Sequence, residues 1–230
     1  MQVGLLGYGY WGKKIFSKLK KLTNVEIAWV YTSQDKWWVD TIDLDWVFIA
    51  TPNDTHFKQV KYFLKQGINV FCEKPLTPTY EQSKELFNLA EKYNVKLYVD
   101  DVFNFRTEKL DTNIFQQNDI EVIWNKKSTN TSYDLYYHDL YLLYPIIKNN
   151  QSILNNIKFK YGQSNNKTHK INNINFTHTE NSNDALLDMI SCVLEGKVDY
   201  DYNKEISLFC NLIIDKKNEK NGLYNGTPKT

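Results

Sequence analysis

Hydrophobic residues follow two different rhythms in the first half of the chain. Short, almost continuous apolar runs, typical of strands buried on both faces, occur at 3–6, 25–31, 46–50, 69–72 and 96–99. Between them, apolar residues recur every three or four positions, as with Ile15, Leu19 and Leu22, and this period predicts helices after the first strand and at 55–66 and 79–93. Strands that alternate with amphipathic helices predict an α/β domain with a parallel sheet.

The second half has a more mixed pattern. It predicts strands at 120–124, 153–161 and 170–178. It also predicts a helix that ends near Phe115 and further helices at 133–147, 184–194 and 205–214. We expect these elements to form a small α+β domain with a reduced, mostly antiparallel sheet, so that 1–105 and 106–230 are separate domains. A reduced sheet leaves a face or an edge to be covered, which favours a homo-oligomer through the second domain.

Three glycines follow the first predicted strand at once. Gly7, Gly9 and Gly12 form the pattern G-x-G-x-x-G between a strand and a helix. In dinucleotide-binding folds the first glycine permits the tight turn, the second lets the backbone approach the pyrophosphate, and the third lets the helix pack closely. The pattern therefore predicts a Rossmann domain that binds NAD or NADP, and the alternative is a glycine-rich turn without a ligand. The residues between the glycines belong to the same candidate loop: Tyr8, Tyr10 and Trp11.

Charge and composition favour small-molecule chemistry. A formal net charge of +1, with lysines spread along the chain, offers no basic field for a nucleic acid. No apolar run approaches the ~20 residues that span a bilayer, and no signal-like segment opens the chain, so we expect a cytoplasmic protein with no membrane partner. Cys72, Cys192 and Cys210 are far apart in apolar surroundings, which favours free thiols over disulfides or a metal centre.

Polar groups follow two buried strands of the first half and interrupt an apolar helix of the second. The segments ATPNDTH, at 50–56, and FCEKPL, at 71–76, stand at the carboxyl ends of strands, where parallel sheets bind their ligands. The helix YDLYYHDLYLLYPII carries Asp134 and His138 one turn apart on one face. On their own, these two residues favour the simpler interpretation of a capping aspartate and a core histidine with hydrogen-bond partners.

The chain contains, in this order, the motifs GYGYWG, TPNDTHF, CEKPLTPTYEQSKEL and YDLYYHDLYLL. Together they resemble the Gfo/Idh/MocA family of glucose-fructose oxidoreductases and inositol dehydrogenases, and most of all its branch associated with nucleotide-sugar and polysaccharide biosynthesis. The resemblance implies that the lysine of Glu-Lys-Pro, Lys74, and the histidine of the Asp-x-x-x-His helix, His138, meet at the nicotinamide. His138 would exchange the proton of a substrate hydroxyl, and Lys74 would stabilise charge on its oxygen. Asp134 would orient the imidazole or bind another hydroxyl.

The resemblance also implies cofactor-binding residues beyond the glycine loop. These follow the third and fourth predicted strands: Thr51, Pro52, Asn53, His56, Glu73 and Lys74. An ordinary strand-to-helix turn explains residues 51–53 as well. A packing role suits His56 equally, and Glu73 equally suits a role in holding Lys74. No metal-ligand set is expected.

The segment after the second strand departs from the family pattern. Where NAD-selective members carry an acidic residue, this chain offers Thr32 and Ser33, with Lys36 nearby, and these groups favour a 2′-phosphate and therefore NADP. Asp35 leaves NAD open, and an ordinary surface loop is the alternative. The second domain is also shorter than the family's usual substrate domain.

Two main functions fit these residues. The leading interpretation is an NAD(P)-dependent oxidoreductase that transfers hydride to or from a secondary hydroxyl or keto carbon of a sugar or sugar nucleotide. The alternative, which the shortened domain favours, is a non-catalytic NAD(P)-binding sensor or a partner protein of a sugar-biosynthesis enzyme. The joint presence of Lys74, Asp134 and His138 favours the enzyme, because a protein that only binds a cofactor has no chemical need for that set. A reductase of a non-sugar carbonyl is a third possibility on the same scaffold.

Overall fold

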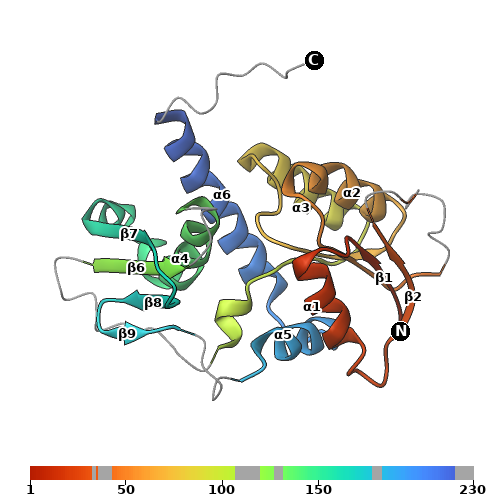
Figure 1. The fold of residues 1–230 in the computed structure, drawn as a ribbon. Helices are drawn as coiled ribbons and strands as arrows, with labels where there is room; N and C mark the ends of the chain where they lie inside the picture. The colour runs from red at the N-terminus through yellow and green to blue at the C-terminus, as the bar shows by residue number, and fades with distance from the viewer. Residues whose placement is uncertain (33–34, 36–42, 107–119, 127–131, 178–182, 221–230) are drawn as a thin grey trace. The chain divides into compact units, whose positions relative to one another are not determined.

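The computed structural model describes residues 1–32, 35, 43–106, 120–126, 132–177 and 183–220 (Figure 1). The chain forms two compact units, of which the first joins Met1–Asp100 to Ile190–Thr230 and the second is Asp101–Met189. The predicted division after residue 105 lies close to the start of the second unit. The C-terminal segment differs from the prediction, because the sequence pattern grouped it with the second domain whereas in the structure it packs with the first.

The first unit contains a five-stranded parallel sheet in the order β2-β1-β3-β4-β5. Its strands are β1 (Gln2–Leu6), β2 (Glu26–Tyr31), β3 (Trp46–Ile49), β4 (Asn69–Cys72) and β5 (Leu97–Val99). The helices α2 (Asn53–Lys65) and α3 (Tyr80–Lys92) lie on one face and α1 (Tyr10–Leu19) lies on the other (Figure 1). The central strands β1, β3 and β4 are apolar and almost entirely buried, as a sheet covered on both faces requires. The predicted Rossmann architecture is confirmed.

Helix α6 (Tyr200–Lys220) is tied to the edge of the Rossmann sheet by polar side chains. The Asn203 amide donates to the Val99 carbonyl and accepts from the Val99 N–H, both at 2.9 Å, so it satisfies the backbone of the edge strand β5. Farther along the helix, Asn211 donates to the Thr77 carbonyl at 2.9 Å, and the Asp215 carboxylate accepts from the Tyr80 N–H. These bonds explain why the C-terminal segment belongs to the first unit. Hydrophobic periodicity predicts a helix here but does not say which sheet it will cover.

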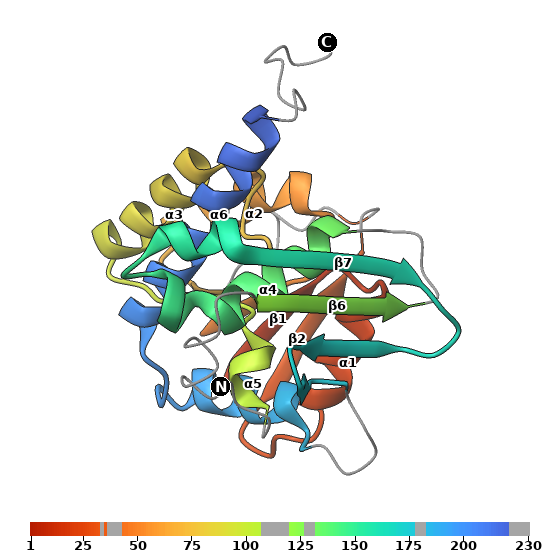
Figure 2. The ribbon, with the colours of Figure 1, turned by 90° about the vertical axis from the view of Figure 1, so that its left-hand side faces the viewer.

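The second unit contains a four-stranded mixed sheet in the order β7-β6-β8-β9 (Figure 2). Its strands are β6 (Ile120–Lys126), β7 (Ile157–Gln163), β8 (Thr168–Ile171) and β9 (Ile174–Asn175). β6 and β7 are parallel, and the other two pairings are antiparallel. Its helices are α4 (Ser132–Ile147) and the short 3-10 segments η1 (Val102–Phe105) and η3 (Gln151–Asn156), while α5 (Ala185–Leu194) spans the boundary of the two units. The predicted reduced, mostly antiparallel sheet is confirmed.

Two strand boundaries in this unit differ from the sequence prediction. The strand predicted at 153–161 begins only at Ile157, because the preceding residues form η3, which Asn150 caps by accepting from the Ser152 N–H at 3.2 Å. The strand predicted at 170–178 is the hairpin β8–β9, which reverses at Asn172 with a φ of 49°. Asparagine tolerates this left-handed conformation better than most residues, so it marks the turn. The helix predicted to end near Phe115 lies outside the described residues.

No helix in the described part of the chain is long and apolar enough to cross a membrane.

Candidate functional site

The turn between β1 and α1 needs glycine at two of its three positions for reasons of packing. Gly7 has a φ of +99°, and a Cβ there would lie 2.4 Å from the Ala50 carbonyl oxygen. A Cβ at Gly12 would lie 1.9 Å from the carbonyl oxygen of Gly7, so α1 approaches the strand too closely for any side chain. Gly9 is different, because nothing lies within 4 Å of its Cβ position. The fold does not require glycine there, whereas a ligand that approaches the backbone does.

The N-terminal end of α1 offers backbone amides to an anion. Gly9 caps the helix without a side-chain hydrogen bond, and the first turn contains no acidic residue. The helix dipole and the unsatisfied amides of such an end favour a phosphate. The side chains of the loop are exposed, Tyr10 to 70%, and the Lys14 Nζ lies 4.5 Å from the ring centroids of both Tyr10 and Trp11. Tyr8 packs edge-on against Phe16 at 5.5 Å. The residues of the turn therefore fit the pyrophosphate of a dinucleotide.

An acidic side chain follows β2 within the described residues. The Asp35 carboxylate accepts from the Thr32 N–H at 2.6 Å and from the Thr32 hydroxyl at 2.8 Å. The bond from the backbone, and to a smaller extent that from the hydroxyl, holds the pKa of Asp35 below its usual value, so the carboxylate is charged at neutral pH. The Thr32 hydroxyl, which the sequence suggested as a partner of a 2′-phosphate, therefore donates its hydrogen bond to Asp35. Ser33 and Lys36 lie outside the described residues.

The turn between β3 and α2 is held by buried hydrogen bonds. The Thr51 hydroxyl donates to Gln59 Oε1 at 2.5 Å, while Pro52 and Asn53 are exposed at the start of α2. His56 is 1% exposed, with Nδ1 3.0 Å from the Pro75 carbonyl oxygen and Nε2 2.9 Å from that of Thr51. Burial lowers the pKa of His56, and these carbonyls oppose that effect. His56 thus connects the turns after β3 and β4, which leaves neither ring nitrogen for a cofactor.

A buried pair of carboxyl groups stands at the ends of β4 and β5. Glu73 and Asp100 follow the paired residues Cys72 and Val99, and they are 5% and 4% exposed. Burial raises the pKa of Glu73 well above its usual value, and the charge of Asp100 adds to this effect, while Lys74 opposes it. Burial and the nearby carboxyl group of Asp100 therefore both favour the neutral form of Glu73. Lys74 is half-buried and follows Glu73 in the chain.

In the second unit, α4 carries the predicted pair Asp134 and His138. His138 is half-buried, and its ring centroid lies 4.5 Å from that of Phe103 in η1. The guanidinium of Arg106 lies 3.8 Å from the centroid of the same Phe103 ring and donates to the Phe176 carbonyl at 2.7 Å. Asp134 is one helical turn before His138, and its side chain is not among those described. His138 thus has a firm aromatic support on one element of its own unit.

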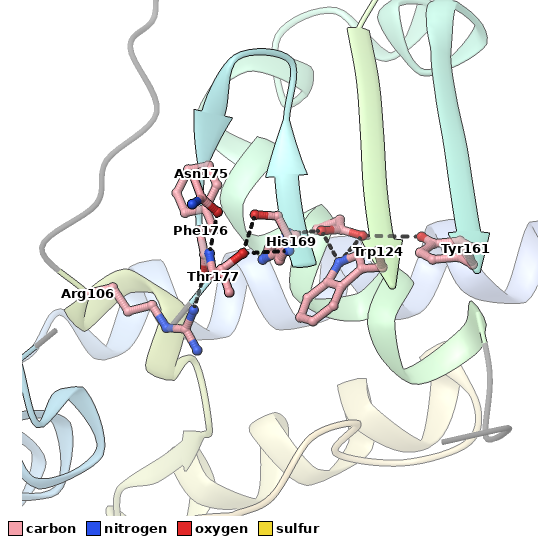
Figure 3. A network of polar contacts seen from close by, with 8 residues as sticks. Arg106, Trp124, Tyr161, His169, Asn175, Phe176 and Thr177 are labelled. Atoms are coloured by element: carbon pink, nitrogen blue, oxygen red, sulfur yellow. Dashed lines mark hydrogen bonds and ion pairs between the residues drawn. The ribbon is translucent and has the colours of Figure 1, made fainter. Parts of the chain in front are cut away.

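The residue after His138 is the centre of a buried polar network that the sequence did not reveal (Figure 3). The Asp139 carboxylate, 0% exposed, accepts from Trp124 Nε1 at 2.9 and 3.1 Å, from the Tyr161 hydroxyl at 3.2 Å and from His169 Nε2 at 2.8 Å. The His169 ring stacks on that of Trp124 with centroids 3.8 Å apart. The sequence does show a carboxylate on a largely apolar helix, which suggests a buried polar contact. It does not show the partners, because they come from three separate strands.

His169 is the histidine of this network. Burial lowers the pKa of His169, and the hydrogen bond that His169 donates to Asp139 opposes the shift. A neutral ring also fits the geometry, because Nδ1 is buried with no hydrogen-bond partner among the described residues, and protonation would place an unsatisfied N–H there. His169 is therefore neutral at pH 7 and donates to Asp139 through Nε2.

We expect acid to destabilise the protein through His169. Below pH ~6.5, where an unfolded histidine gains its proton, the folded state lacks that proton, so stability falls by up to about 1.4 kcal/mol per pH unit until the lower folded pKa is reached. Urea unfolding between pH 7.5 and 5.5 should therefore show a larger loss for the wild-type chain than for His169→Gln. An equal loss in both proteins would contradict the assignment of a neutral His169.

A family model described as "Oxidoreductase family, NAD-binding Rossmann fold" matches residues 15–101. Residues 15–101 are thus similar to the Rossmann domain of the Gfo/Idh/MocA oxidoreductases. An uncharacterized oxidoreductase of Schizosaccharomyces pombe is 43% identical to it over 70 residues, which are 30% of this chain and 19% of that protein. The uncharacterized oxidoreductase YdgJ of Escherichia coli is 33% identical over 108 residues, which are 40% of this chain and 31% of that protein. The chain thus matches between 19% and 31% of the length of these two relatives.

Known structures resemble the chain over nearly its whole length. A UDP-N-acetylglucosamine 3-dehydrogenase from Acidithiobacillus ferrooxidans has a TM-score of 0.68 at 14% identity and covers 94% of this chain and 96% of its own. The WlbA dehydrogenase from Thermus thermophilus, in complex with NAD and UDP-GlcNAcA, has a TM-score of 0.61 at 14% identity and covers 93% and 94%. At such identity the likeness establishes the fold, a Rossmann unit followed by a smaller sheet.

Proposed function

We propose that this Gfo/Idh/MocA chain is an NAD(P)-dependent oxidoreductase that transfers hydride to or from a secondary hydroxyl or keto carbon of a sugar or sugar nucleotide. The observation that carries the proposal is the glycine turn, in which packing explains Gly7 and Gly12 but leaves open space at Gly9. Backbone amides at the start of α1 would hold the pyrophosphate, and residues 51–53 would line the nicotinamide side. When bound, NAD(P) accepts or supplies the hydride.

His138 and Lys74 are the proposed acid-base pair of the reaction. Removal of hydride from an alcohol carbon requires removal of the hydroxyl proton, and an imidazole suits this task at neutral pH. His138 is half-buried on a firm aromatic support, so it can meet a substrate without being fully solvated. Lys74 would donate to the same oxygen and stabilise its negative charge, with the buried pair of Glu73 and Asp100 beside it. The joint action of Lys74 and His138 on one oxygen is taken from the family resemblance.

The function is tested first by titration with NADH and NADPH and then by turnover. A panel of sugars, inositols and UDP-sugars would be followed by the absorbance change of the nicotinamide. The expected result is tight cofactor binding with turnover of at least one secondary alcohol. Cofactor binding without turnover of any substrate in the panel would favour the non-catalytic alternative, and absence of binding would reject both.

We infer that Asp35 decides the choice between the two cofactors. Hydrogen bonds from Thr32 hold the Asp35 carboxylate just after β2. A carboxylate there would repel a 2′-phosphate and bind the free ribose diol of NAD, so we weigh it above the hydroxyl and lysine groups that favoured NADP. We therefore expect calorimetry to show NAD(H) bound at least as tightly as NADP(H). Asp35→Asn should shift the ratio of the two affinities toward NADP(H) by roughly three- to tenfold, less at high salt. A ratio that the substitution leaves unchanged would remove Asp35 from the site.

Self-association through the second unit remains part of the proposal. Among the described strands the sheet β7-β6-β8-β9 is not closed, and self-association would cover a terminal strand, β7 or β9. Light scattering decides the point, and a mass of 27.2 kDa across a range of concentrations would reject it.

A further inference from the structure

We infer that Asp139 is a positioning residue for His138, and that His169, Trp124 and Tyr161 serve the reaction through it. The inference rests on the proposed role of His138 in proton transfer. It concerns residues to which the sequence assigned no role and which lie within the second unit, as do the contacts between them described above. Two independent paths lead from the buried carboxylate to the imidazole of His138, one through the helix backbone and one through an aromatic ring.

The first path is the attachment of α4 to the sheet. One carboxylate on this helix receives hydrogen bonds from side chains on three different strands: Trp124 on β6, Tyr161 on β7 and His169 on β8. Bonds from three directions fix both the rotation of the helix and its position along its axis. Because His138 is the residue before Asp139, about 100° around the helix, its Cα is fixed by the same bonds. Loss of the carboxylate would free the turn that presents the imidazole.

The second path is the aromatic support of the His138 ring. Phe103 lies between His138, at 4.5 Å, and the stacked pair of Trp124 and His169, at 6.2 and 5.5 Å between ring centroids. The Arg106 guanidinium lies against the same ring, which limits its movement. The Trp124 and His169 rings are in turn held by Asp139 (Figure 3). A change at Asp139 therefore reaches His138 through its ring as well as through its backbone.

The charge of Asp139 has a chemical consequence of its own. Trp124 can only donate a hydrogen bond, and His169 donates through Nε2, so the network is built to receive donors at a carboxylate. A negative charge on the residue beside His138 stabilises the imidazolium that forms when His138 accepts a proton from the substrate. An asparagine at 139 would lose this charge and would turn an NH₂ group toward one of the donors. A network with a merely structural role would change stability and leave the chemical step unaltered.

The experiment compares single-turnover hydride transfer in cofactor-saturated, folded variants. We expect Asp139→Asn and His169→Phe to slow the chemical step by roughly 10- to 100-fold, because small displacements of a catalytic group have effects of this size. Gln at 169 can still donate to Asp139, so His169→Gln should recover most of the rate lost in His169→Phe. Ile171→Ala on β8 is the matched control, since it removes buried apolar volume from the same sheet, and the hydrogen bonds described for the network do not involve its side chain. Its rate should stay within about threefold of wild type.

A double variant separates positioning from general damage. If Asp139 acts through His138, the variant His138→Ala with Asp139→Asn should be no slower than His138→Ala alone. Fully multiplied losses, or equal losses in Ile171→Ala and Asp139→Asn, would overturn the inference.

An NMR measurement makes the result independent of turnover. The ring C–H resonance of His138 should shift in Asp139→Asn and in His169→Phe but not in Ile171→Ala. An unmoved resonance would overturn the inference even in a chain with normal activity. Normal turnover in His138→Ala would instead overturn the proposed function, and the resonance would still show whether the network sets the imidazole.

Discussion

Replacement of His138 by alanine is expected to slow hydride transfer by roughly 100- to 10,000-fold, which is the usual effect of losing a positioned proton-transfer group. Cofactor affinity should change little, because the proposed pyrophosphate site consists of backbone amides in the other unit. Stability should also change only moderately, since the imidazole is half-buried and its described ring contact is with Phe103. The measurement is single-turnover kinetics with any alcohol that the protein oxidises, together with a thermal melt and a cofactor titration.

Lys74→Met tests the other half of the same proposal. It should also slow the chemical step by a similar factor, because charge on the substrate oxygen would lose its stabilising partner. If both residues act on one oxygen, the double variant should lose less than the product of the two single losses. A near-normal rate in folded, cofactor-saturated His138→Ala would return this histidine to a packing role and leave the oxidoreductase proposal without its base.

The second large effect is expected at Gly9, where valine should weaken NAD(P)H binding by roughly 10- to 100-fold. The backbone there has φ −77° and ψ −156°, which a residue other than glycine can adopt, and no atom lies within 4 Å of the Cβ position. The fold should therefore persist with nearly the wild-type melting temperature, while the added methyl groups occupy the space proposed for the pyrophosphate. Calorimetric titration with NADH and NADPH measures the loss.

Gly12→Ala is the matched comparison, because it should act on the fold rather than on the ligand. Its Cβ would lie 1.9 Å from the Gly7 carbonyl oxygen, so α1 must move away from the strand for the chain to fold. We expect a clearly lower melting temperature for Gly12→Ala, whereas Gly9→Val should melt at nearly the wild-type temperature. Unchanged cofactor affinity in folded Gly9→Val would mean that the open space serves no dinucleotide.

The Rossmann unit was predictable from the sequence because its strands are buried on both faces. A strand of this kind is a short apolar run with clear ends, and the run at 69–72 coincides with β4. The second unit gave a weaker signal, since its strands are buried on one face only and their apolar residues are interrupted by exposed ones. The sequence therefore did not separate η3 from β7 or detect the reversal at Asn172.

The candidate site was predictable only where one segment carries it. The glycine turn and the residues after β3 and β4 are contiguous, and a motif can represent them. Asp139 and His169 are 30 positions apart and meet only because β8 pairs with β6 beneath α4. The partnership of Glu73 and Asp100 likewise depends on the neighbouring positions of β4 and β5. Contacts set by sheet order leave no local pattern in a single sequence.

The attachment of α6 to β5 also has a consequence for how the protein is made on the ribosome. Asn203 bonds to Val99 across a separation of 104 residues, so all of the second unit is synthesised before this contact can form. Until then the nascent Rossmann unit exposes an unpaired strand edge, which is a template for association with other chains. Contacts of such separation also form slowly, because a long loop must close first. The edge of β5 should therefore stay open to association with other chains until α6 has emerged and packed against it.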